Sequence, residues 1–171
     1  FFASYGQTFF ISLFNIEIRF FYGLSDGEFG LVYAISTLLS SFILISFAKL
    51  IDHIDLRVYS LIVTIGLLLA CVGMVVMFSN IFYLFIIIFM LRFFGQGAMT
   101  HAGETTMARY FGNNRGKALS VATLGGMTGV MLLPYIALNY FKNIEMNQLW
   151  FYASISIIVF IPFIFFALSN Q

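Results

Sequence analysis

Long apolar stretches without a charged residue dominate the hydrophobic pattern of this chain. These charge-free stretches cover residues 1–16, 29–48, 58–91, 118–141 and 146–171. The third is too long for one membrane crossing, and Ser79-Asn80 within it offers a break with a helix-starting residue. The pattern therefore predicts six transmembrane helices, at about 1–16 (cut short), 27–51, 56–79, 81–110, 115–141 and 147–169.

Helix-starting residues stand at several of these boundaries. Ser25 and Glu28 have the spacing of a capping box, and Asp55, Asn114 and Asn147 are candidate N-caps of later helices. The connections are short, so no soluble domain is expected between the helices.

The composition agrees with an all-α membrane protein. Of the 171 residues, 61 % are hydrophobic and 9 % are charged, whereas a soluble domain carries about 25 % charged residues. The net charge of +1 argues against a nucleic-acid partner. Cys71 is the only cysteine, and we expect it to act as a small hydrophobic residue in a helix interface. Trp150 is predicted to anchor the last helix at the membrane surface.

Basic residues predict the orientation of the helices. The connections after the second and fourth helices hold Lys49, Arg57, Arg109, Arg115 and Lys117, and the other connections hold Arg19 and Lys142. The positive-inside rule then places the second–third and fourth–fifth loops in the cytoplasm. We expect a multi-pass protein of the cytoplasmic (inner) membrane with both ends of the chain inside.

An internal repeat is suggested when the sequence is aligned with itself at an offset of 89 positions. This offset aligns Gly6 with Gly95 and Gln7 with Gln96, and it also aligns Gly23 with Gly112. Two triplets of helices would then lie inverted in the membrane, as in many secondary transporters. Glycine is common in the chain, with 14 residues, so chance coincidence is the alternative.

Polar residues near mid-depth predict that the first and fourth helices line a wet cavity, whereas the third and sixth could face lipid.

Arg92 is the main candidate for a functional residue. It lies roughly 18 Å along the fourth helix, close to the middle of a hydrocarbon core about 30 Å thick. Gln96 shares its helical face, and Gln7 could contribute from the first helix. A fixed guanidinium with an amide beside it suits a small carboxylate. The alternatives are a structural role for Arg92 and a helix–helix hydrogen bond for Gln7.

His101 and Glu104 form a second candidate group on the fourth helix. An α-helical rotation of 100° per residue places them about 120–180° from Arg92. They could relay protons, or Glu104 could pair with Arg109, Arg115 or Arg57. The structural role is the commoner one near a helix end. Two ligands make no metal site, so no metal or cofactor is expected.

Three segments resemble the major facilitator superfamily. The stretch Arg92–Gly97 resembles its fourth-helix signature, although the glycines are one position closer. Residues 48–57 resemble its loop motif, with Asp52 and Arg57 matching, and residues 108–129 resemble monocarboxylate and oxalate/formate porters. The resemblance covers the whole chain as the N-terminal six-helix half of a twelve-helix fold, with the C-terminal half missing. It also implies that Asp52 pairs with Arg109 or Arg57 as a cytoplasmic gate, although ordinary surface solvation is the alternative.

Glycines on two helices are expected to serve packing. Small residues allow helices to approach closely in lipid. These glycines are Gly95 and Gly97 on the fourth helix and Gly125, Gly126 and Gly129 on the fifth.

Together these features predict a secondary active transporter of a small, monocarboxylate-like organic anion. Alternating access would be coupled to protons or run as symport or antiport exchange, with the missing half or a second copy completing the cavity. One alternative is a complete six-helix protein, acting as a homodimeric carrier or as a non-transporting regulatory bundle. An enzyme is disfavoured because clustered catalytic residues are lacking.

Overall fold

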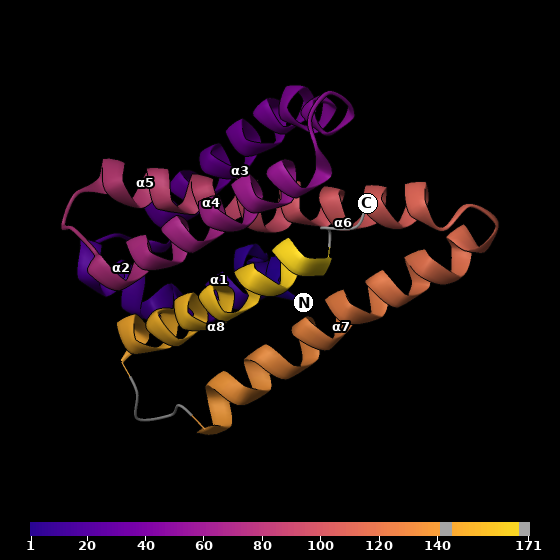
Figure 1. Cartoon of the computed structure of the whole chain (residues 1–171). Coiled ribbons are helices and arrows are strands. Elements are labelled where there is room, and N and C mark those ends of the chain that lie inside the picture. The colour runs from indigo at the N-terminus through magenta and orange to yellow at the C-terminus, as the bar shows by residue number, and fades with distance from the viewer. Residues whose placement is uncertain (141–144, 168–171) are drawn as a thin grey trace.

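The computed structural model describes residues 1–140 and 145–167, and every regular element in this part of the chain is helical (Figure 1). Five helical rods are long and apolar enough to cross a membrane: Asp26–Asp52, Leu56–Val76, Ile81–Tyr110, Gly112–Asn139 and Met146–Phe166. Each corresponds to one predicted helix. The predicted ends at 141 and 169 lie outside the described residues, as does Lys142.

The elements follow one another along the chain with short connections. They are η1 (Phe2–Gly6), α1 (Thr8–Ile11), η2 (Ser12–Phe14), α2 (Asn15–Tyr22), α3 (Asp26–Ala48), η3 (Lys49–Asp52), α4 (Leu56–Val76), α5 (Ile81–Met90), η4 (Leu91–Met99), α6 (Thr100–Tyr110), η5 (Gly112–Asn114), α7 (Arg115–Tyr140) and α8 (Met146–Ala167). The elements α5, η4 and α6 are continuous and form what we call the central rod.

Several helices begin where a side chain satisfies a free backbone amide. Ser25 and Glu28 make the expected capping box at the start of α3. Asp55 caps α4 and Asn80 caps α5, each through its own carboxylate or amide oxygen. The prediction for Asn147 is wrong, because α8 begins at Met146 and Asn147 lies inside its first turn.

The single helix predicted at 1–16 is not observed. Gln7 has an extended conformation, with φ −80° and ψ 151°, and separates η1 from α1. Gly6 packs directly on the central rod: a Cβ placed on it would lie 2.7 Å from the Cα of Gly95. A side chain at Gly6 would force the two backbones apart. The extended residue beside it interrupts the helix where these backbones cross.

The middle of the central rod is π-helical. Residues Leu91–Met99 form η4 between two α-helical sections. The i→i+5 hydrogen bonds of a π-helix turn each residue through a smaller angle than in an α-helix, and such segments are frequent at functional sites. The rotation of 100° per residue used to predict helix faces therefore fails beyond Leu91.

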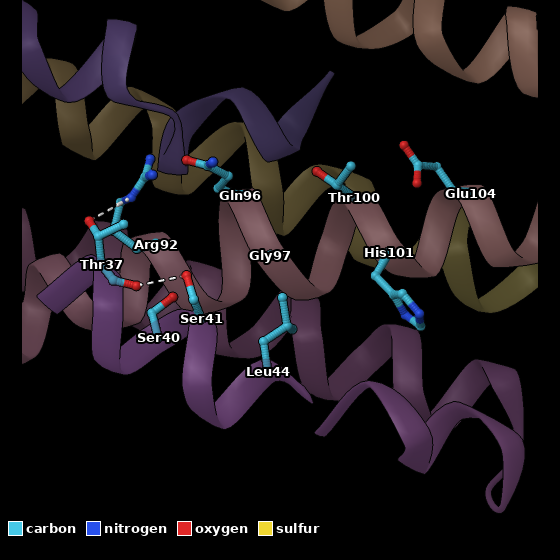
Figure 2. A pocket seen from close by; sticks show the side chains of 10 residues that line it. All are labelled: Thr37, Ser40, Ser41, Leu44, Arg92, Gln96, Gly97, Thr100, His101 and Glu104. Atoms are coloured by element: carbon cyan, nitrogen blue, oxygen red, sulfur yellow. Dashed lines mark hydrogen bonds between the residues drawn. The ribbon is translucent and has the colours of Figure 1, made fainter. Parts of the chain in front are cut away.

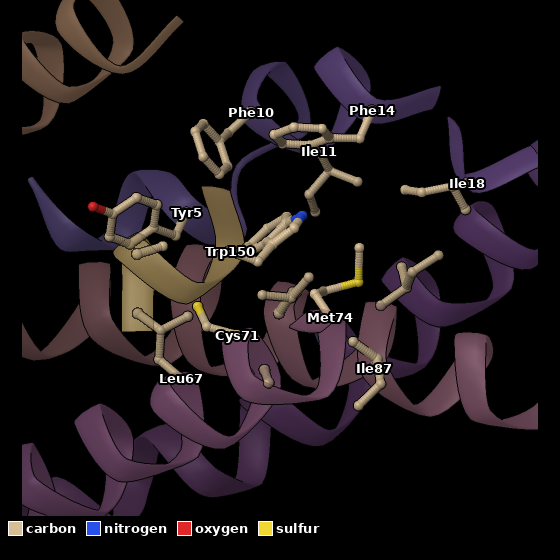
Figure 3. Close-up of a cluster of buried hydrophobic side chains, with 14 of the residues drawn as sticks. Tyr5, Phe10, Ile11, Phe14, Ile18, Leu67, Cys71, Met74, Ile87 and Trp150 are labelled. Carbon is tan, nitrogen blue, oxygen red and sulfur yellow. The ribbon is translucent and has the colours of Figure 1, made fainter. Parts of the chain in front are cut away.

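The core lies where α4 and α8 pack along each other and against the N-terminal segment (Figure 3). Trp150 is fully buried and its ring makes an edge contact with Phe10, so it does not face lipid as a surface anchor would. Half of the most apolar stretch of α4 is buried inside the protein, whereas only 11 % of the corresponding stretch is buried in α3 and in α7. The helix α4 therefore does not face lipid around most of its circumference. Cys71 is buried in this core, which confirms its expected role as a small apolar residue.

Candidate functional site

A polar cavity of about 290 Å³ lies between α3 and the central rod (Figure 2). Its lining residues come from these two elements: Thr37, Ser40, Ser41, Leu44, Arg92, Gln96, Gly97, Thr100, His101 and Glu104. The prediction that the first helix lines the cavity is therefore not confirmed. Among the described residues Gln7 is not part of the lining, although its neighbours Gly6 and Thr8 contact Arg92.

Arg92 is held by oxygen atoms from two other segments. It is only 6 % exposed. Its Nη1 donates to the carbonyl of Gly6 at 3.1 Å and to Oγ1 of Thr8 at 3.1 Å, and its Nε donates to Oγ1 of Thr37 at 3.2 Å. The break at Gln7 makes the first of these bonds available, because the helix does not continue over the Gly6 carbonyl.

Tyr33 completes the surroundings of this guanidinium. The Tyr33 ring centroid lies 5.3 Å from the Cζ of Arg92, within the range of a cation–π contact. Its hydroxyl donates to Oγ1 of Thr8 at 2.8 Å, so Thr8 accepts from both residues. Sequence reasoning missed Tyr33 and Thr37. The available signal was their spacing of four residues on one face of an apolar helix.

The oxygen partners of Arg92 are all neutral. Within the described part of the chain, ion pairs join Arg19 to Asp26 and Arg109 to Asp52, and none involves Arg92. Hydroxyl and carbonyl dipoles satisfy the N–H groups but leave the net positive charge in place. A buried charge in this setting is costly unless it is paired.

His101 and Glu104 line the same cavity as Arg92 and Gln96. The α-helical estimate placed them on a different face, and the smaller rotation per residue in η4 accounts for the difference. Gln96 Oε1 and His101 Nδ1 are buried without a hydrogen-bond partner among the described residues. In the same part of the chain Glu104 makes no ion pair, so its expected pairing with a basic residue is not observed.

A second polar contact lies at the far end of the central rod. Arg109 forms an ion pair with Asp52 and donates through Nη1 to the carbonyl of Ile51 at 3.1 Å. These bonds fasten the end of α6 to η3, which is one of the two expected pairings of Asp52. The backbone amide of Arg57 donates to Asp55 at the start of α4.

The glycines singled out by the sequence differ in their surroundings. Gly95 lies against Gly6, and a Cβ on Gly97 would come within 2.9 Å of Leu44. On α7, Gly129 lies against Ser4, a Cβ on Gly125 would lie 3.8 Å from the nearest atom, and Gly126 faces open space. The contact made by Gly6 was not anticipated.

No group of three or more His, Cys, Asp or Glu residues that could hold a metal occurs in the residues that the structure describes. The cavity instead offers the buried guanidinium of Arg92, one amide, several hydroxyl groups, the His101 imidazole and the Glu104 carboxylate.

Five helical rods long and apolar enough to cross a membrane indicate an integral, multi-pass membrane protein, and a partly open polar cavity lies between two of these rods. A family model described as Major Facilitator Superfamily matches residues 1–170, and the chain belongs to this family of membrane transporters. No curated protein and no solved structure matched the chain.

Proposed function

We propose that this transporter carries a small organic anion by alternating access and that Arg92 binds the anion. The observation that supports this proposal is a guanidinium 6 % exposed, in the middle of an apolar rod, with neutral oxygen partners and an aromatic face. Hydrogen bonds from a cation to a carboxylate are roughly twice as strong as neutral ones, about 1.5–3 kcal/mol. Because three neutral oxygens fix the side chain in advance, the anion would meet an ordered donor.

The other polar residues have auxiliary roles in this proposal. Gln96 contacts the substrate from the next turn of the central rod, and Gln7 shapes the break that exposes the Gly6 carbonyl. His101 and Glu104 serve proton coupling or exchange, which their place in the same cavity supports. Monocarboxylates remain the first candidates because carboxylates match the guanidinium.

We also propose that helices of the two halves of the chain are related as inverted repeats. In such an arrangement, elements that lie close to the two-fold axis contact the elements that the axis relates to them. Gly6 contacts Gly95, its counterpart at the offset of 89 positions. Likewise α4 packs along α8, and η1 crosses η4. These contacts support the repeat, although the N-terminal segment is more broken than the central rod.

A second six-helix unit would complete the transport path. Only 11 % of the most apolar stretch is buried inside the protein in α3 and in α7. These two helices therefore expose the largest share of their surface to lipid or to such a unit. Either a C-terminal half of the same protein or a second copy could supply it. The proposed cytoplasmic gate, at the inner-membrane face, is the Asp52–Arg109 pair with Arg57 nearby in the chain, which would open and close during alternation.

The test is anion uptake by Arg92→Gln in proteoliposomes. We expect uptake to fall by about 100-fold or more, in keeping with loss of one partner of a buried charged pair. Arg115→Gln at the exposed start of α7 is the matched control and should transport normally. Membrane insertion and monodispersity should be equal in both variants, and normal uptake by Arg92→Gln would rule out the proposed site.

A further inference from the structure

The cavity contains hydrogen-bond acceptors that its own side chains leave unused. Gln96 Oε1 is buried and makes no hydrogen bond within the described part of the chain, and the same holds for Nδ1 of His101. An amide oxygen only accepts, and Nδ1 accepts when the imidazole carries its proton on Nε2. A buried acceptor without a donor costs about 1–3 kcal/mol, so a bound molecule that supplies donors gains affinity here.

Hydroxyl groups lie on the α3 side of the same cavity (Figure 2). Thr37 Oγ1 accepts from Arg92 and keeps its own O–H to donate. Ser40 lines the cavity and is 3 % exposed. Such hydroxyls can rotate to donate or accept. The cavity therefore surrounds a bound molecule with groups of both kinds.

A bare carboxylate satisfies only the donors among these groups. Its two oxygens only accept, so they suit Arg92 and the hydroxyl donors but leave Gln96 Oε1 without a partner. Water can satisfy these atoms when no substrate is bound. A ligand part that displaces such water without reproducing its hydrogen bonds loses affinity. An aliphatic tail beside Gln96 is therefore disfavoured, whereas a hydroxyl group replaces water directly.

We propose that the substrate is a carboxylate whose carbon chain carries several hydroxyl groups. Its carboxylate lies at Arg92, and its hydroxyl groups donate to Gln96 Oε1 and exchange hydrogen bonds with Ser40 and Thr100. This assignment rests on the anion site proposed above and specifies its ligand. A lining that extends from Arg92 to Glu104, and a cavity volume of about 290 Å³, leave room for a chain of several carbons.

The first experiment compares ligands of equal chain length on the purified full-length protein. Gluconate and hexanoate each have six carbons and one carboxylate, but only gluconate carries hydroxyl groups; sorbitol is the neutral polyol. Calorimetric titration should give gluconate at least about tenfold tighter binding than hexanoate, the value of one satisfied buried acceptor. Sorbitol should bind more weakly than gluconate because it lacks the anion.

The outcomes separate this inference from the proposed function. Equal binding of gluconate and hexanoate, lost in Arg92→Gln, overturns the hydroxylated substrate and leaves the anion site intact. Binding of either acid that is unchanged in Arg92→Gln overturns both. Tight gluconate binding that Arg92→Gln abolishes supports both.

A substitution at Gln96 tests whether this residue causes the preference for gluconate over hexanoate. Gln96→Met removes both amide atoms at similar length, and we expect the tenfold preference for gluconate over hexanoate to shrink to less than about threefold. The control is Gln148→Met, an exposed glutamine in the first turn of α8, which should keep the preference. An undiminished preference in Gln96→Met overturns the role of Gln96. If Gln96→Met fails to fold, the comparison of ligands on the unmodified protein decides the inference.

Discussion

The central rod holds two arginines, Arg92 in its middle section and Arg109 at one end, in opposite environments. Arg92 in η4 is 6 % exposed and contacts neutral oxygens of Gly6, Thr8 and Thr37. At the end of α6, 42 % of the Arg109 side chain is exposed, and it pairs with the carboxylate of Asp52. The first environment orders a cation and leaves its charge uncompensated, whereas the second neutralises the charge within the protein.

This difference in partners suits Arg92 to the proposed binding of an anion and Arg109 to holding two helical segments together. A neutralised, half-exposed pair contributes about 0–1 kcal/mol and can open and close readily. An uncompensated buried cation has a large free energy to gain from an external anion. The same residue type therefore has two proposed roles on one rod, and the partner determines which.

The largest effect is expected when Arg92 is given a carboxylate partner within the protein. Thr37→Asp places an acid where Thr37 Oγ1 accepts from Arg92 Nε. We expect a folded protein whose anion uptake is lower by up to about 100-fold, because the internal ion pair competes with substrate. The isosteric control Thr37→Asn keeps the site neutral and should lose far less. Equal uptake by the two variants would contradict the charge argument.

The second prediction concerns the crossing that presents the Gly6 carbonyl to Arg92. A Cβ at Gly6 meets backbone atoms of Leu91 and Gly95, which cannot move independently of the rod. Gly6→Ala should therefore lower the free energy of unfolding by about 1–3 kcal/mol, the usual penalty of overpacking. Gly30→Ala on α3, where a Cβ has open space, is the control. Thermal unfolding in detergent measures both, and equal midpoints would refute the tight crossing.

A smaller effect is expected from the aromatic face over Arg92. Tyr33→Leu removes the cation–π contact, worth about 0.5–2 kcal/mol, and should raise the KM for the anion by roughly two- to 30-fold. Tyr33→Phe keeps the ring and loses only the hydrogen bond to Thr8, so it should retain more of the affinity. Initial uptake rates over a range of concentrations give both constants. An identical KM for the two variants would show that the ring does not position Arg92.

The smallest effect should follow from breaking the exposed pair. Asp52→Asn should lower stability by at most about 1 kcal/mol. If the pair is a gate, the turnover rate should change while substrate affinity at Arg92 stays the same. Exchange of the charges in Asp52→Arg/Arg109→Asp should restore part of the turnover. A change in affinity with constant turnover would instead link this end of the rod to the binding site.

Much of the fold could be predicted from local patterns. Charge-free stretches located the five rods, and the spacing of Ser25 and Glu28 located the start of α3. These features depend on a residue and its near neighbours, so hydropathy and capping rules apply directly. The place of Arg92 in the middle section of one rod likewise followed from its position along one apolar stretch.

Only the tertiary structure decided which groups surround that arginine. Thr37 and Gly6, which hold it, are distant in sequence, and the break at Gln7 and the π-helical turn in η4 both occur where Gly6 crosses Gly95. An apolar sequence specifies that a segment enters lipid, but many rotations about its axis bury similar areas. Close packing of particular side chains selects one rotation, and with it the neutral partners that leave the charge of Arg92 available.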